Sequence, residues 1–170
     1  MMSEGFGKKI VVRGTRYTEI PILAGIQCAA WKAAFGDIIT AETMKKYTDV
    51  RKCAQMLERV FDSGIGHMYI AGIDGKACGE LFWKSVDEQN AEIVALHTLK
   101  RVWGSGVGRA LMDKALTDIA EDGFFAVTLW VFKENIRARK FYEKCGFTPT
   151  GQERASAYDR AAEVQYRRIL

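Results

Sequence analysis

The chain has 170 residues, of which 48% are hydrophobic, and it carries a formal net charge of +4. This length and composition predict one domain, 1–170, with a sizeable core, and they exclude a disordered protein. The chain has no apolar run of about 18 residues and no basic segment followed by an apolar one, and its Lys and Arg are interspersed with acids, so we expect a cytoplasmic protein without a membrane or nucleic-acid partner.

The N-terminal third predicts one strand followed by two helices. A β-branched run bounded by glycines predicts a strand over 8–14. Thr18 suits the N-cap of the first helix, whose apolar residues recur at helical spacing until Gly36 ends it. A second helix is expected from about Thr40, with an apolar stripe that ends at residues 62–64.

The middle of the chain predicts a meander of three antiparallel strands. Residues 67–86 form two apolar runs joined by Asp74 and Gly75, and this dipeptide is the strongest hairpin signal in the chain. A third run follows over 91–99. Three consecutive runs of this kind favour three neighbouring antiparallel strands.

The C-terminal third alternates helix and strand. The pattern is helical from Gly104 to about Glu121, and 124–132 is a nearly continuous apolar run, typical of a strand covered on both faces. A helix over 134–147 and a last strand over 161–170 follow. The expected order β-α-α-β-β-β-α-β-α-β-β predicts an α/β (α+β) fold, with a mixed sheet and helices on both of its faces.

The cysteines and histidines form neither a metal-binding nor a disulfide pattern. The cysteines are spread along the chain without a CxxC pair, and the histidines are too few to complete a zinc site. We therefore expect buried or half-buried free thiols, no metal ion and no disulfide framework. These residues are Cys28, Cys53, Cys78, Cys145, His67 and His97.

The segment VWGSGVGRALM, residues 102–112, places glycines at 104, 106 and 108 in the front of the expected helix. A glycine inside a helix costs about 0.5–1 kcal/mol relative to alanine, so these glycines indicate that side chains would obstruct something there. A strand, a glycine-rich turn and a helix start together form an anion site, because free N–H groups and the positive end of the helix dipole converge. The spacing fits neither a Rossmann fingerprint nor a P-loop, since Arg109 stands at the Rossmann position and no GKS or GKT follows.

Two segments carry a resemblance to a known family. Residues 91–112, AEIVALHTLKRVWGSGVGRALM, and residues 135–147, NIRARKFYEKCGF, resemble two motifs of the GNAT superfamily of acetyl-CoA-dependent N-acetyltransferases. The resemblance implies a mostly antiparallel central sheet of about seven strands, with acetyl-CoA as co-substrate and no metal. Trp103 replaces the usual Arg or Gln, and Lys100 replaces a frequent proline. Because position 103 acts largely through its backbone in the family, we expect phosphate binding to survive.

The resemblance also assigns cofactor contacts. In the family the fourth strand diverges from the fifth, and the pantetheine arm pairs with strand backbone in the gap. The glycine turn holds the pyrophosphate, mainly through backbone donors, while an asparagine contacts the arm and a tyrosine lies near the sulfur. The corresponding residues here are Leu96, His97 and Thr98; Gly104, Ser105, Gly106, Val107, Gly108 and Arg109; Asn135, which also suits a helix N-cap; and Tyr142.

The implied chemistry is direct transfer of the acetyl group to a neutral amine, with a strand N–H stabilising the oxyanion. Tyr142 would act as the acid, because a phenol is a hydrogen-bond donor at neutral pH. Glu92 resembles the glutamate base of the histone acetyltransferase branch. His97 or a chain of waters is the alternative base, and strict alternation along 92–99 puts His97 on the face opposite Glu92.

We therefore expect an N-acetyltransferase whose acceptor is the primary amine of a small molecule. Trp31 and Phe35 share a helix face and form either core or a wall of the acceptor site. A protein lysine or N-terminal acetyltransferase is the alternative enzyme, although Trp130 stands where the N-terminal branch carries a glutamate. A CoA-binding sensor without transfer activity is the other alternative. Exposed apolar strands near the C-terminus would allow a homodimer.

Overall fold

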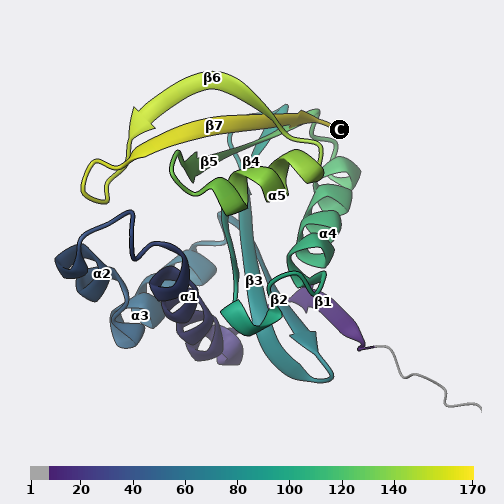
Figure 1. Ribbon diagram of the computed structural model, residues 1–170. Helices are drawn as coiled ribbons and strands as arrows, with labels where there is room; N and C mark the ends of the chain where they lie inside the picture. Colours follow the sequence, from purple (N-terminus) through teal and green to yellow (C-terminus); the bar gives the residue numbers. More distant parts are fainter. Residues whose placement is uncertain (1–7) are drawn as a thin grey trace, which may run out of the picture.

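A mixed sheet of seven strands forms the centre of the computed structural model, which describes residues 8–170 (Figure 1). The strands follow the order β1, β2, β3, β4, β5, β7, β6, and β4 and β5 are its one parallel pair. This arrangement confirms the predicted fold class. The prediction of an N-terminus without a leader concerns mainly residues 1–7, which lie outside the described residues. The strands are β1 (Ile10–Gly14), β2 (Gly66–Ile73), β3 (Lys76–Ser85), β4 (Asn90–Thr98), β5 (Ala126–Phe132), β6 (Thr148–Ala155) and β7 (Ala162–Ile169).

Within residues 8–170, three α-helices, rather than the predicted two helices, precede the meander. The predicted second helix is divided into two. Its first part begins after Thr40 and ends at Thr48. Asp49 then caps a new helix by accepting a hydrogen bond from the N–H of Lys52. The helical segments are η1 (Tyr17–Glu19), α1 (Ile20–Ala34), α2 (Ala41–Tyr47), α3 (Val50–Ser63), η2 (Lys100–Val102), α4 (Val107–Glu121) and α5 (Ile136–Lys144).

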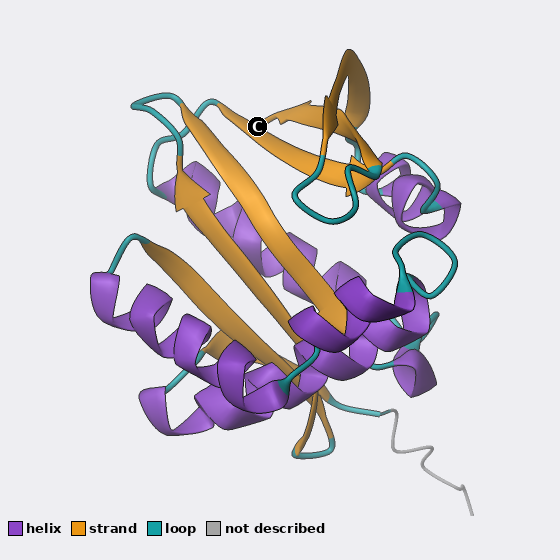
Figure 2. Cartoon of the chain, turned by 90° about the vertical axis from the view of Figure 1, so that its left-hand side faces the viewer, coloured by secondary structure: helices purple, strands orange, loops and turns teal. Residues whose placement is uncertain are grey.

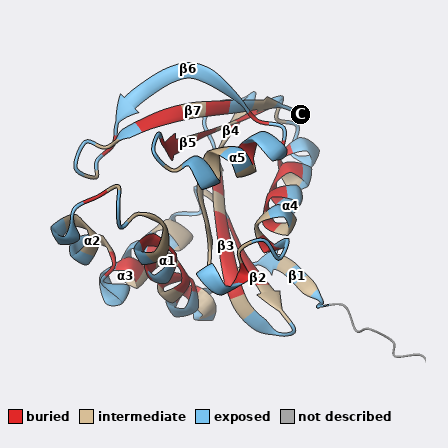
Figure 3. Ribbon diagram, in the orientation of Figure 1, coloured by how far each residue is buried: buried red, intermediate tan, exposed pale blue. Residues whose placement is uncertain are grey.

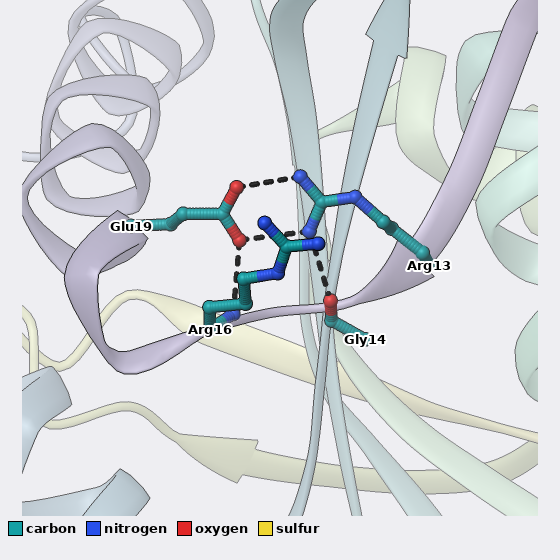
Figure 4. A network of polar contacts seen from close by, with 4 residues as sticks. All are labelled: Arg13, Gly14, Arg16 and Glu19. Carbon is teal, nitrogen blue, oxygen red and sulfur yellow. Dashed lines mark hydrogen bonds and ion pairs between the residues drawn. The ribbon is translucent and has the colours of Figure 1, made fainter.

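The start of α1 differs from the sequence prediction. Thr18 lies inside η1 and does not cap α1, which follows Glu19. The Glu19 carboxylate accepts hydrogen bonds from the guanidinium of Arg13 and from the N–H of Arg16 (Figure 4). These contacts, the Arg13 bond foremost, lower the pKa of Glu19 to about 2. A carboxylate suits the positive end of the helical segment better than a threonine hydroxyl does, and it also ties β1 to α1.

Helices cover both faces of the sheet (Figures 1 and 2). Alternate residues of β2 divide the core between them: Met68 and Ile70 pack against α1 and α3, whereas Tyr69 and Ala71 belong to the layer of α4. The buried residues accordingly concentrate in the central strands and on the inner side of α4 (Figure 3). The sheet is therefore a partition between two hydrophobic layers, and an opening in it connects two separate sides of the molecule.

The predicted meander is confirmed. Asp74 and Gly75 join β2 to β3 with φ of 50° and 80°, as a two-residue hairpin turn requires. β4 then pairs antiparallel with β3. The last two strands of the expected order are β6 and β7, and β6 is an exposed edge strand.

A bulge at Val94 changes the side-chain pattern of β4. Val94 has no partner on β3, so one extra residue enters the strand. Glu92 pairs with Lys84 and His97 pairs with Glu80, and these two β3 residues share a face because they are separated by an even number of positions. Glu92 and His97 consequently lie on the same face, and the prediction of opposite faces is wrong. Strict alternation does not hold across the bulge.

Candidate active site

A cavity of about 570 Å³ lies where β4 and β5 separate. The two strands pair only from Asn90 to Ile93, while β5 remains bonded to β7 along its other edge. The walls of the cavity come from α1 and α3 on one face of the sheet, and from α5 and the turn before α4 on the other. The separation of the two strands therefore lets one cavity pass from face to face.

The glycine turn presents backbone N–H groups on the α4 side. Gly104 and Gly106 have φ of 77° and 94°, a left-handed conformation that is costly for residues with a side chain. These residues form a turn, and for this reason the helix begins at Val107 and not at the predicted Gly104. The N–H of Ala110 makes the bond to the Gly106 carbonyl, so the N–H groups of residues 107–109 precede the intrahelical ladder. They are donors at the positive end of the helix dipole.

Gly108 and Ser105, the other predicted residues of the turn, differ in their contacts. Gly108 lines the cavity, and an added Cβ would meet Phe141 at 3.5 Å, an ordinary contact, so the protein's own packing does not require glycine there. The N–H and the hydroxyl of Ser105 both donate to the Val102 carbonyl, at 3.1 and 2.6 Å. The predicted donors of Ser105 are therefore used inside the turn.

Trp103 stands beside this turn in a fixed position. Its indole N–H donates to the carbonyl of Thr98 at 3.2 Å, and the guanidinium of Arg137 lies 3.5 Å from the centroid of its ring. The position where the resemblance expects Arg or Gln thus holds an aromatic ring that carries a guanidinium from α5 on its face. Arg137 thus places a positive charge near the glycine turn.

The helix α5 contributes Asn135 and Tyr142. The side chain of Asn135 accepts a hydrogen bond from the N–H of Ala138, which confirms it as the N-cap, and the residue also lines the cavity. Tyr142 lines the cavity as well, and its hydroxyl forms no hydrogen bond with residues 8–170. Burial, with a smaller effect of Cys145, raises the pKa of Tyr142 to about 12. The hydroxyl therefore keeps its proton at neutral pH and is a free donor.

Three polar side chains form a chain on the α1 side of the cavity. The indole N–H of Trp31 donates to Nε2 of His97 at 3.1 Å, and Nδ1 of His97 lies 2.8 Å from Oε1 of Glu80. The sheet register produces the second contact, because Glu80 and His97 are directly opposite on β3 and β4. The sequence reasoning did not select Glu80, although a charged residue inside the apolar run CGELFW was a visible signal.

Aromatic side chains line this side of the cavity. Trp31 packs edge-on against Phe35 and Tyr158, with ring centroids 5.2 and 4.9 Å apart. Trp31 and Phe35 belong to a packed cluster and also line the cavity, while their role as a wall of the acceptor site stays a prediction. The loop between β6 and β7 is tied to the start of α2, since Asp159 accepts a hydrogen bond from the N–H of Thr40 at 2.7 Å.

The structure brings most of the predicted site residues to this cavity. Glu92 is not one of them, because it pairs with Thr128 of β5 where the two strands are still joined. The side chain of Val107 is completely buried, which leaves its N–H as its contribution. Ser105 does not line the cavity. The predicted residues that do are Leu96, His97, Thr98, Gly104, Gly106, Gly108, Arg109, Asn135 and Tyr142.

The four cysteines are free and buried, as the sequence predicts. Within residues 8–170, no three His, Cys, Asp or Glu side chains gather closely enough to hold a metal ion. The helices in this part of the chain are all too short or too polar to cross a membrane.

Comparison with known proteins places the chain among acetyltransferases. The model of the acetyltransferase (GNAT) family matches residues 35–147. An uncharacterized N-acetyltransferase of Mycobacterium tuberculosis is 26% identical over 134 residues, which cover 79% of this chain and 86% of that protein. The mycothiol acetyltransferase of Beutenbergia cavernae is 41% identical over 76 residues, but this match covers 45% of the chain and only 26% of that protein.

The fold has close structural counterparts. The PaiA N-acetyltransferase of Thermoplasma acidophilum, solved in complex with coenzyme A, superimposes with a TM-score of 0.80. The superposition covers 95% of this chain and 99% of that one, at 17% sequence identity. At this identity the likeness establishes the shared fold, including the central sheet in which the cavity opens.

Proposed function

Because the chain belongs to the acetyltransferase (GNAT) family, we propose that it uses acetyl-CoA to acetylate the primary amine of a small molecule. Membership of the family makes the protein an N-acetyltransferase. One observation carries the proposal for the two substrates. A single cavity joins an anion-binding helix start on one face of the sheet to an aromatic pocket on the other face.

The α4 side of the cavity fits acetyl-CoA. The free N–H groups of residues 107–109 suit the pyrophosphate, and the Arg137 guanidinium adds positive charge nearby. The edge of β4 beyond Ile93 has no strand partner on the β5 side, so its backbone suits the amide groups of the pantetheine arm. The solved relative from Thermoplasma acidophilum holds coenzyme A. Acetyl-CoA, when bound, would supply the acetyl group as an activated thioester.

Tyr142 suits the role of the acid in this reaction. Its hydroxyl keeps its proton at neutral pH and has no competing partner in the described residues, and the residue lines the cavity. A donor in this state can protonate a departing thiolate. An N–H on the unpaired edge of β4 is suited to hold the oxyanion that forms at the carbonyl, because backbone donors need no reorganisation.

The other side of the cavity favours a small acceptor over a polypeptide. An internal lysine or a chain terminus would need an open path for the peptide that carries it. Here Tyr158 packs on Trp31, and Asp159 bonds the β6–β7 loop to Thr40 at the start of α2. These contacts join the β6–β7 loop to α1 and to the start of α2, and we infer that they leave little room for a polypeptide. The four free thiols agree with a reducing compartment, so we place the reaction in the cytoplasm.

Calorimetric titration with acetyl-CoA, followed by a thiol-release assay, tests this function. The acceptors are small primary amines, a lysine-containing peptide and a peptide with a free N-terminus. We expect binding of acetyl-CoA and faster thiol release with small amines than with either peptide. Faster release with a peptide would make the protein a protein acetyltransferase, and binding without release would favour a sensor. Absence of binding would remove acetyl-CoA from the proposal.

A further inference from the structure

Glu80 is a buried carboxylate at the wall of the cavity. Its residue surface is only 3% exposed, and the residue lines the cavity on the α1 side. One of its oxygens, Oε1, contacts Nδ1 of His97 at 2.8 Å. The other oxygen, Oε2, forms no hydrogen bond with residues 8–170, and it is not one of the fully enclosed atoms that lack a partner. Oε2 therefore keeps some accessible surface, and because Glu80 lines the cavity we place that surface at the cavity wall.

The hydrogen bonds around Glu80 have a fixed direction. An indole N–H can only donate, so Nε2 of His97 must accept the bond from Trp31. A neutral imidazole with an accepting Nε2 carries its proton on Nδ1, and this proton points at Oε1 of Glu80. Trp31 thus fixes the tautomer of His97, and His97 fixes the carboxylate. Both are positioning residues that leave one carboxylate oxygen for a ligand.

The charge of Glu80 lacks a cationic partner in the described residues. No Lys or Arg of residues 8–170 forms an ion pair with it. Its titratable neighbours are His97, which is held in the neutral tautomer, and the buried thiols of Cys28 and Cys53, whose pKa values are raised, chiefly by burial. Glu163, also a glutamate of the cavity wall, differs because Arg154 pairs with it at 2.6 Å. A buried carboxylate without a cation is unfavourable unless a ligand provides the cation.

We propose that Glu80 binds the ammonium group of the acceptor and removes its proton, and that the acceptor is a primary amine with an apolar, flat body. This inference rests on the proposed function. The body of the acceptor would lie against Trp31, Phe35 and the apolar side chains of α3 that line the same side. A carboxylate next to the amine would be repelled by Glu80, so arylalkylamines such as benzylamine are favoured over amino acids.

In the proposed reaction Glu80 is the base on one face of the sheet and Tyr142 is the acid on the other. The ammonium gives one proton to Oε2 of Glu80, and its nitrogen lone pair attacks the thioester carbonyl. The C–N bond forms and the C–S bond breaks, with Tyr142 donating its proton to the thiolate. The second proton lost by the nitrogen returns through water to the Tyr142 oxygen, and Glu80 releases its proton to solvent. The products are the amide, CoA thiol and one proton.

The matched pair of benzylamine and benzyl alcohol tests the ammonium site without turnover. Each is titrated into the protein saturated with CoA, for the wild type, for Glu80→Gln and for Glu88→Gln, an exposed glutamate of the turn before β4. We expect the wild type and Glu88→Gln to bind benzylamine at least tenfold more tightly than benzyl alcohol, because a buried charge pair replaces a neutral hydrogen bond. Glu80→Gln should lose this preference and bind the alcohol as the wild type does.

Turnover and stability complete the test. With benzylamine and acetyl-CoA, Glu80→Gln should release thiol about 100-fold more slowly while its affinity for acetyl-CoA is unchanged. Its melting temperature should equal or exceed that of the wild type, because the variant removes an unpaired buried charge.

Three results would each overturn the inference: a preference of Glu80→Gln for the amine as large as that of the wild type, a large fall in the melting temperature of this variant, or no binding of benzylamine to the wild type. Thiol release by Glu80→Gln at the wild-type rate, with loss of activity in Glu92→Gln, would assign the base to Glu92. Failure of acetyl-CoA to bind the wild type would instead overturn the proposed function.

Discussion

The two sides of the cavity are built from different parts of the chain. The α4–α5 side consists largely of backbone: two left-handed glycines and the free N–H groups of residues 107–109. The α1–α3 side consists of side chains, with Trp31, His97 and Glu80 supplied by three separate elements. Backbone recognition depends on local conformation, whereas side-chain recognition depends on elements far apart in sequence. Substitutions should therefore act on the two substrates separately.

The largest effect is expected at Tyr142, the one side chain of the α5 side to which we assign chemistry. Tyr142→Phe removes the hydroxyl and keeps the ring, so its turnover number should fall about 100-fold. Its affinity for acetyl-CoA should stay within about twofold, because the ring still fills the same space. Thiol release and calorimetry measure the two quantities. Unchanged turnover would exclude the acid role, and weakened binding alone would make Tyr142 a binding residue.

A backbone substitution in the glycine turn should come next. Gly106→Leu places a side chain at a φ of 94°, so the turn must change shape and its N–H groups must move. We expect the affinity for acetyl-CoA to fall at least tenfold, measured by calorimetry.

Gly123 provides the matched control, since it has a φ of 88° at the opposite end of α4. Gly123→Leu should destabilise the fold to a similar degree and leave the affinity for acetyl-CoA unchanged. Equal losses of affinity in both variants would show that strain in α4, and not the turn itself, is responsible.

The same contrast explains what the sequence could predict. The glycine turn, the cap at Asn135 and Tyr142 belong to short motifs, and a short motif specifies its own backbone. The meander was predictable because Asp74 and Gly75 encode their turn directly. On the other side, nothing local connects Trp31 with His97.

The missed features depend on long-range register or on competition between local signals. The bulge at Val94 placed Glu92 and His97 on one face, and this could not be inferred from alternation in β4 alone. Glu80 became a cavity residue because it is opposite His97 in the sheet. At the start of α1, Thr18 had the better intrinsic propensity to cap, but it lies inside η1; the N-cap position falls at Glu19, whose side chain bonds Arg13 and the N–H of Arg16 and makes no capping bond to α1.

A smaller effect is expected from the indole N–H groups, which occur on both sides. Trp31→Phe keeps an aromatic ring, although a smaller one, and removes the indole N–H that donates to Nε2 of His97, so the tautomer is no longer fixed. One hydrogen bond contributes about 1 kcal/mol, which corresponds to about a fivefold rise in the KM for benzylamine. Trp103→Phe removes the donor to the Thr98 carbonyl and should lower only the affinity for acetyl-CoA. If both variants changed the same constant, the two sides would not act separately.

The smallest effect is expected at Glu19, which supports the α1 side without contacting the cavity. Glu19→Gln should lower the free energy of unfolding by about 1 kcal/mol at pH 7, because a charged contact to Arg13 and to the helix start is lost. Since the pKa of Glu19 is lowered to about 2 in the folded state, its contribution is complete above the ordinary value near 4.5 and is lost as the pH falls towards 2. Urea unfolding of both proteins from pH 7 to pH 2 should therefore show a difference in the free energy of unfolding that shrinks below pH 4.5 and is largely lost at pH 2. A difference of undiminished size at pH 2 would mean that the carboxylate acts through its shape and not through its charge, while a change in acetyl-CoA affinity would show that α1 also supports the cofactor side.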